Sequence, residues 1–243
     1  MMNLQVCFTA NTKDPSDINE LLETLRYYSS KCAHVTELGT RTGISTSAFL
    51  MGQRNPEQSL FVAYDIQESP EALLVFEYAK RDGKRFEYII QDDLAPGFEI
   101  APTEFLFIDT LHTYKQLSQE LERHANNVSK MIAFHDTVSF GDHDEVIAGI
   151  TDNPQHPQYN GSEKHGLMTA ITEFMEKNPQ REILEDHKNN NGLIILKNKD
   201  YDNTRTYVPK SLSMETINAN GTLTETDKLN MAALTESLDD PLE

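Results

Sequence analysis

The chain of 243 residues repeats one pattern five times: a short apolar run stops on polar residues, and a stretch with helical spacing follows in most repeats. Strands that alternate with helices pair in parallel, because each helix returns the chain to the edge where the previous strand began. We therefore predict an α/β fold around a parallel, doubly wound sheet. The predicted strands are 34–38, 59–64, 86–90, 105–108 and 130–134.

Two further apolar runs, 181–185 and 193–197, are separated by a linker that ends in Asn-Asn-Asn-Gly. Strands joined by a short turn-rich linker form an antiparallel hairpin. The prediction thus becomes a Rossmann-like sheet of seven strands, mostly parallel with an antiparallel last strand. We divide the chain into an N-terminal extension with a helix (1–33, extended before the helix over 18–28), a main domain (34–200) and an acidic tail (201–243), expected to be flexible or weakly docked.

Composition restricts the partners. The net charge is −18 and the isoelectric point is about 4.8, which disfavours binding to nucleic acid. No apolar stretch is long enough for a membrane span, and the start has no basic region of a secretory signal, so we expect a cytoplasmic protein. Cys7 and Cys32 cannot build a disulfide framework and are expected to be reduced. Association between copies of the chain stays open.

Polar residues at the ends of the predicted strands are the candidate site, because ligands bind there in open parallel sheets. Gly39 and Gly43 allow close approach of the backbone to a ligand at a helix N-terminus. Arg41 stands where a dinucleotide fingerprint has its second glycine, which disfavours a pyrophosphate. Glu37 favours a cationic ligand, and Asp65 can accept both hydroxyls of a ribose. The alternative is that both acids only cap helices.

Three segments carry a family resemblance. Residues 36–46, Thr-Glu-Leu-Gly-Thr-Arg-Thr-Gly-Ile-Ser-Thr, resemble motif I of class I S-adenosylmethionine-dependent methyltransferases. Residues 107–114 and 133–137 resemble the fourth- and fifth-strand motifs of the branch that includes catechol O-methyltransferase, macrolide-sugar O-methyltransferases and cephalosporin-hydroxylase-type enzymes. The resemblance extends over about 31–197 and implies a methyltransferase with S-adenosylmethionine as its cofactor.

The resemblance also implies roles for the strand-end residues. Asp65 would hold the ribose hydroxyls, and either Asp92 or Asp93 would bind the adenine edge. Asp109 and Asp136 match metal-binding acids, and His112 matches a general base. His135 stands where relatives carry an acid, so it is the third candidate metal ligand. The methionine and ribose part of the cofactor would be lined by Glu37, Gly39, Thr40, Gly43 and Ser45.

The chemistry of these residues agrees with that assignment. An alcohol has a pKa far above seven, so its methylation requires a base, a cation, or both. Two strand-end carboxylates suit Mg²⁺, whereas a histidine ligand points to a softer ion. We predict S-adenosylmethionine-dependent O-methylation of a small hydroxylated molecule such as a sugar or polyol, assisted by a divalent metal, Mg²⁺, and by His112.

Two other functions remain open at this level. One is an NAD-dependent oxidoreductase on a similar fold, and the other is a methyltransferase-like protein that binds a ligand without catalysis. In the latter case His112 and His135 would be packing residues. The irregular segment 137–165, which contains His143, Asp144 and Glu145, is expected to be a solvated loop that closes over the substrate.

Overall fold

A computed structural model of the chain describes residues 3–148, 151 and 162–201. All five predicted strands are present, and a helix follows each of them except β3 in this part of the chain. The elements are α1 (Leu4–Lys13), a 3₁₀ turn (Asn19–Leu21), α2 (Leu22–Ser29), β1 (His34–Leu38), α3 (Ile44–Gly52), β2 (Leu60–Asp65), α4 (Pro70–Arg81), β3 (Phe86–Ile90), β4 (Thr103–Ile108), α5 (Tyr114–His124), a 3₁₀ turn (Ala125–Asn127), β5 (Val128–His135), α6 (Leu167–Lys177), β6 (Arg181–His187) and β7 (Leu193–Asn198).

The strands form one seven-stranded sheet in the order β3-β2-β1-β4-β5-β7-β6. The first five pair in parallel, and β7 runs antiparallel to both β5 and β6. The predicted mixed sheet with an antiparallel last strand is therefore confirmed. Strand order reverses between β1 and β4, the position at which open α/β sheets bind ligands.

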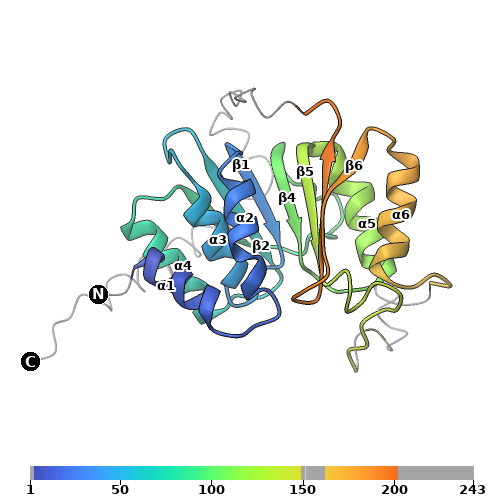
Figure 1. Cartoon of the computed structure of the whole chain (residues 1–243), viewed down its shortest axis with the longest axis horizontal. Helices are drawn as coiled ribbons and strands as arrows, with labels where there is room; N and C mark the ends of the chain where they lie inside the picture. Colours follow the sequence, from blue (N-terminus) through green and yellow to red (C-terminus); the bar gives the residue numbers. More distant parts are fainter. Residues whose placement is uncertain (1–2, 149–150, 152–161, 202–243) are drawn as a thin grey trace, which may run out of the picture. The chain divides into compact units, whose positions relative to one another are not determined.

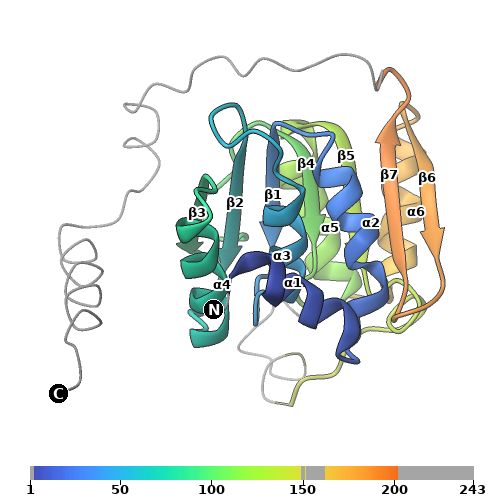
Figure 2. The same ribbon diagram turned by 60° about the vertical axis from the view of Figure 1, so that its left-hand side comes forward.

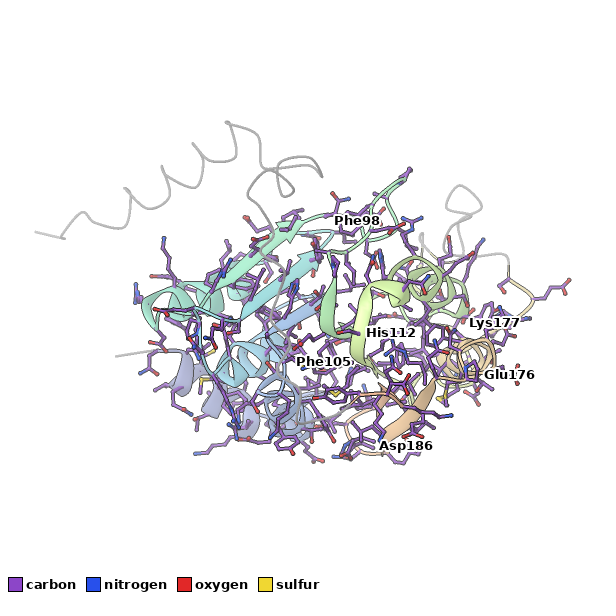
Figure 3. The ribbon with its side chains drawn as sticks, turned by 90° about the horizontal axis from the view of Figure 1, so that it is seen from above. Phe98, Phe105, His112, Glu176, Lys177 and Asp186 are labelled. Carbon is purple, nitrogen blue, oxygen red and sulfur yellow. The ribbon has the colours of Figure 1, made fainter. Side chains whose placement is uncertain are left out.

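Two helical layers cover the sheet, one on each face (Figures 1 and 2). Side chains alternate along each strand, so that Phe105 and Phe107 of β4 pack in the cluster with α1–α4, whereas Leu106 and Ile108 pack with α5 and α6. Figure 3 shows Phe105 in the interior and Glu176, at the end of α6, on the rim. The apolar strands are thus buried on both faces, as parallel sheets require.

The opening of the chain differs from its prediction. Residues before Asp14 were predicted to be extended, but they form helix α1. The side chain of Asn3 accepts a hydrogen bond from Val6 N at 2.9 Å and caps the helix. Leu4 and Phe8, four residues apart, lie on one helix face and are buried in the cluster with α3. Tertiary packing therefore stabilises a helix whose own sequence gives only a weak signal.

Some sequence predictions concern residues outside the described part. Residues 202–243 of the predicted tail and residues 152–161 of the predicted loop are among them. In the described ranges no helix is both long and apolar enough to cross a membrane. Neither Cys7 nor Cys32 forms a disulfide in these ranges.

Candidate active site

The carboxyl ends of β4 and β5 bring the predicted metal and base residues together. Ile108 and Phe134 are paired across the two strands, so Asp109 and His135 come next to each other at the sheet edge. His112 follows in the turn before α5. Asp136 has a left-handed backbone, with φ of 58°, which a residue with a side chain adopts only under constraint.

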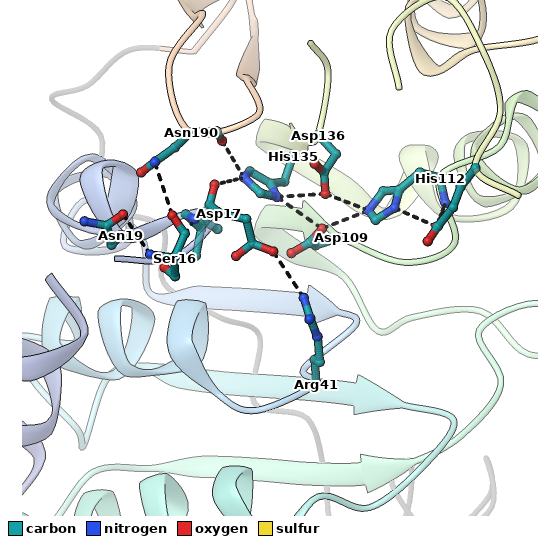
Figure 4. Close-up of polar contacts among 11 residues, drawn as sticks. Ser16, Asp17, Asn19, Arg41, Asp109, His112, His135, Asp136 and Asn190 are labelled. Atoms are coloured by element: carbon teal, nitrogen blue, oxygen red, sulfur yellow. Dashed lines mark hydrogen bonds and ion pairs between the residues drawn. The ribbon is translucent and has the colours of Figure 1, made fainter. Parts of the chain in front are cut away.

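These four side chains form one polar cluster (Figure 4). His112 Nε2 lies 3.2 Å from Asp109 Oδ1 and 3.0 Å from Asp136 Oδ2. His135 Nδ1 lies 3.3 Å from each of the same two oxygens. Burial opposes ionisation of both acids, but the hydrogen bonds from the two imidazoles outweigh it and lower the pKa of Asp109 and of Asp136. The cluster is therefore built around two ionised carboxylates.

His112 has a carboxylate at each ring nitrogen. Its Nδ1 lies 2.9 Å from Glu145 Oε2, and its ring stacks on Phe140 with a centroid separation of 5.0 Å. Burial favours the neutral ring, but Asp109, Asp136 and Glu145 raise the pKa of His112 to about 12. While Nε2 keeps its proton between Asp109 and Asp136, the ring carries a positive charge and has no lone pair for a substrate proton. A divalent cation held by these two acids would replace that proton and take the lone pair of Nε2.

His135 is oriented from the opposite side. Its Nε2 lies 3.1 Å from the carbonyl oxygen of Asp17 and 3.0 Å from that of Asn190. Carbonyl oxygens only accept hydrogen bonds, so Nε2 carries a proton and Nδ1 faces the two carboxylates. Burial favours the neutral ring, but Asp109 and Asp136 raise the pKa of His135 to about 10. His135 thereby ties the segment before α2 and the β6–β7 linker to the site.

Asp109, His112 and Asp136 have the donor set of a divalent metal site. Each offers one ligand atom, and the three atoms lie within 4.8 Å of one another. Asp136 Oδ1 is buried and has no hydrogen-bond partner in the described residues, as expected of an oxygen reserved for a ligand. Glu145 at His112 Nδ1 completes the carboxylate–histidine–metal arrangement that fixes the tautomer of a ligating imidazole. These residues fit a metal ion.

Glu145 and Asp144 are the functional residues that sequence reasoning missed. Glu145 N donates to the carbonyl oxygen of His112 at 2.8 Å. Asp144 Oδ1 accepts from Tyr114 N at 2.7 Å and from Gly166 N at 2.9 Å, so it joins the starts of α5 and α6. The two acids tether their segment to the site instead of lying free in solvent. Because they act some thirty residues away along the chain, no local pattern marks them.

Gly39 makes the close approach of β1 and β4 possible. Its φ is 85°, and a Cβ atom there would lie 2.0 Å from the carbonyl oxygen of Asp109. The tight contact predicted for a ligand is thus occupied by the backbone that carries the first metal-site acid. Asp109 N in turn donates to Leu38 O at 2.9 Å. The glycine turn and the acid cluster are consequently one structural unit.

Asp65 shapes the glycine turn from the end of β2. Its Oδ2 accepts hydrogen bonds from Thr40 N at 2.9 Å and Arg41 N at 2.7 Å. Among the described residues its Oδ1 accepts from Gln67 N alone, at 3.0 Å, which leaves one lone pair of Oδ1 for a hydroxyl. After β3 the two candidate adenine-binding acids separate: Asp92 is exposed, whereas Asp93 is buried against α5.

Glu37 lies behind the turn and not at its surface. It is fully buried, and its carboxyl oxygens accept from Ser45 Oγ at 2.5 Å and from Thr46 Oγ1 at 2.6 Å. Burial raises the pKa of Glu37 to about 8, against the lowering effect of these two hydroxyls. Glu37 and Ser45 therefore connect β1 to the first turn of α3, and Glu37, which keeps its proton up to about pH 8, gives a ligand no negative charge at neutral pH.

This burial predicts a pH dependence of stability. The folded chain holds the Glu37 proton up to about pH 8, whereas the unfolded chain releases it near 4.5. A group that binds its proton more tightly in the folded state makes stability fall as pH rises between these values. As pH rises from about 5 to 8, the Tm of the Glu37→Gln variant should therefore fall less than the Tm of the native chain. Parallel Tm curves in thermal melts would refute this.

No family model and no curated protein matches this chain. Solved structures do. An O-methyltransferase from Bacillus cereus in complex with S-adenosylhomocysteine is 18% identical over 80% of this chain and 88% of that one, with a TM-score of 0.54. The fold is that of S-adenosylmethionine-dependent O-methyltransferases.

Two further structures have the same methyltransferase fold. One is the methyltransferase PaMTH1 of Podospora anserina, solved with S-adenosylhomocysteine (14% identity, 81% of this chain and 88% of that one, TM-score 0.50). The other is the O-methyltransferase TomG of Streptomyces achromogenes, solved with S-adenosylmethionine (12% identity, 80% of this chain and 88% of that one, TM-score 0.50). The fold expected from the motif I resemblance is therefore the fold of these structures.

Proposed function

We propose that this chain is an S-adenosylmethionine-dependent O-methyltransferase that methylates a hydroxyl of a small molecule, of the sugar or polyol class, with a divalent metal. One observation carries the proposal: within a methyltransferase fold, Asp109, His112 and Asp136 converge at the sheet edge directly beside the glycine turn. A site that holds a cation next to the cofactor can present a hydroxyl oxygen to the sulfonium methyl.

The cofactor half of the site is the turn between β1 and α3. Gly39 and Gly43 have positive φ angles, and the N-terminus of α3 follows at Ile44. Asp65 holds the turn and offers Oδ1 to a ribose hydroxyl, while the exposed Asp92 can reach the adenine edge. The negative charge of Asp65 and Asp109 around the turn favours a sulfonium cofactor over a pyrophosphate, and this argues against the oxidoreductase alternative.

The acceptor half is the metal cluster. A bound divalent cation stabilises the developing alkoxide and lowers the pKa of the hydroxyl. Asp109, His112 and Asp136 would hold the ion, and Glu145 would keep the ring of His112 in the ligating tautomer. His135 orients both carboxylates. Because one of the three donors is an imidazole nitrogen, we propose that the site prefers Mn²⁺ or a softer ion over the Mg²⁺ expected from the acids alone.

Methyl transfer tests the proposal directly. The full chain is incubated with methyl-labelled S-adenosylmethionine and a library of sugars and polyols, with Mn²⁺ or Mg²⁺ and with a chelator. We expect label on a hydroxyl oxygen with metal and none with chelator. Chelator-insensitive transfer would remove the metal from the mechanism. Binding of the cofactor without transfer to any hydroxylated compound would support the non-catalytic alternative.

Removing the Asp65 carboxylate is expected to weaken cofactor binding. Asp65→Ala removes an acceptor for the ribose and releases two turn amides, so we expect a loss of about 2–3 kcal/mol, or roughly 30- to 150-fold in Kd. Calorimetric titration with S-adenosylhomocysteine measures this. Glu68→Ala, which removes a nearby exposed acid, is the matched control and should bind normally. Equal Kd values for the two variants would place the cofactor elsewhere.

A further inference from the structure

A second polar cluster lies on the α5 face of the sheet and contains none of the three metal ligands. Asp93, in the segment after β3, is 6% exposed, and Glu120, in the middle of α5, is fully buried. Both carboxyl groups lie at the same side-chain amide, because Gln116 Nε2 is 2.6 Å from Glu120 Oε1 and 3.4 Å from Asp93 Oδ1. The proposed methyl transfer uses neither Asp93 nor Glu120, so the burial of these two acids needs a separate explanation.

One oxygen of each acid, Glu120 Oε1 and Asp93 Oδ1, accepts hydrogen bonds from neighbouring side chains. Glu120 Oε1 accepts from Thr110 Oγ1 at 2.5 Å and from Gln116 Nε2 at 2.6 Å. Gln116 Nε2 also reaches Asp93 Oδ1, at 3.4 Å. Thr110 directly follows Asp109 and begins the turn that carries His112. The pair is thus attached, through Thr110, to the turn that forms the metal site.

The other oxygen of each acid has no hydrogen-bond donor in the described residues. Asp93 Oδ2 and Glu120 Oε2 are both buried, and neither has a hydrogen-bond partner among residues 3–148, 151 and 162–201. The nearby basic groups do not compensate them: Arg123 and His124, both from α5, direct their nitrogens to the carbonyl oxygen of Asp93, at 3.5 and 3.0 Å. Two buried carboxylates that share one amide donor, and that each keep an oxygen without a donor, cannot both be ionised at moderate cost.

We propose that Asp93 and Glu120 share one proton between Asp93 Oδ2 and Glu120 Oε2, and that this acid pair clamps α5 and the Thr110 turn to the segment after β3. Burial first, and then the charge of Asp93, raise the pKa of Glu120 well above its usual range, in agreement with a retained proton. His112 and His135 line the pocket into which Glu120 also faces, so loosening of the clamp would be felt at the metal site.

Amide substitutions test for the shared proton. In Glu120→Gln the new amide N–H can donate to Asp93 Oδ2, and in Asp93→Asn the new amide can donate to Glu120 Oε2. Each single variant should therefore melt within about 2 °C of the native chain at pH 7, measured with chelator present. In the double variant two amide nitrogens face each other, and its Tm should fall by roughly 4–8 °C. Single variants that melt as low as the double variant would overturn the proposal.

An infrared measurement observes the proton itself. Glu37→Gln serves as the background, because Glu37 is a second buried acid with a raised pKa. In that background we expect the carbonyl band of a protonated carboxyl at pH 7, and we expect it to disappear when Glu120→Gln or Asp93→Asn is added. A band that survives both additions, or that is absent from the background, would contradict a proton shared by these two residues.

Discussion

Replacing His112 by alanine is expected to abolish tight binding of a divalent metal, with a loss of more than about a hundredfold in affinity, because the ring supplies one of three converging ligand atoms. The same variant should retain S-adenosylhomocysteine binding, since His112 contacts the acids of the acceptor half and not the glycine turn. Metal affinity is measured by calorimetry in the absence of any acceptor.

This measurement separates the two roles considered for His112. A ligand affects metal affinity before any chemistry takes place, whereas a general base affects mainly the catalytic constant. His143→Ala is the matched control, because the His143 side chain is 62% exposed, pairs with Asp142 and contacts the ring of Phe140, but forms no ion pair with Asp109 or Asp136 in the described residues. Unchanged metal affinity in His112→Ala, together with lost turnover, would restore the base role.

Gly39→Ala is expected to destabilise the fold by roughly 3–5 kcal/mol, because its Cβ would meet the carbonyl oxygen of Asp109 at 2.0 Å and the backbone would be held at a φ of 85°. The clash displaces the backbone of Asp109, which is one of the three metal ligands. Metal affinity should therefore fall in the fraction that still folds. Chemical denaturation and metal titration give the two readouts.

Gly83→Ala is the control that tests only the strain of an alanine at a positive φ, without a steric clash. Gly83 also has a positive φ, of 68°, but a Cβ atom there would have nothing within 4 Å. The Gly83→Ala substitution should lower the free energy of unfolding by about 1–2 kcal/mol and leave metal affinity unchanged. If both alanine variants lost the same stability, the close contact between Gly39 and Asp109 would not be a structural constraint.

The sequence sufficed for the features that depend on local pattern. Apolar runs that stop on polar residues predicted every parallel strand, and the linker around Asn190 predicted the closing hairpin. The period of two along β1 places Glu37 in phase with Val35, on the face covered by α3. Its burial follows from the helices that cover both faces of the sheet, since every residue of β1 is buried.

The remaining features depend on contacts between distant residues. Glu145 reaches His112 across 33 residues, and only the fold brings them together. Which of Asp92 and Asp93 faces solvent is decided by Gln116 and Glu120 on α5, not by the loop that contains the two acids. Helix α1 was missed for the same reason, since its stability comes from packing of Leu4 and Phe8.

The central claim is that one site, at the carboxyl edge of the sheet, takes an S-adenosyl cofactor beside a metal held by Asp109, His112 and Asp136. Calorimetric titration of the full chain with S-adenosylmethionine, followed by NAD as a competitor, tests it most directly. We expect saturable binding of S-adenosylmethionine that NAD does not displace and that Asp65→Ala weakens. Binding of NAD in its place, or no binding of S-adenosylmethionine with metal present, would show that this edge of the sheet is not an S-adenosyl cofactor site.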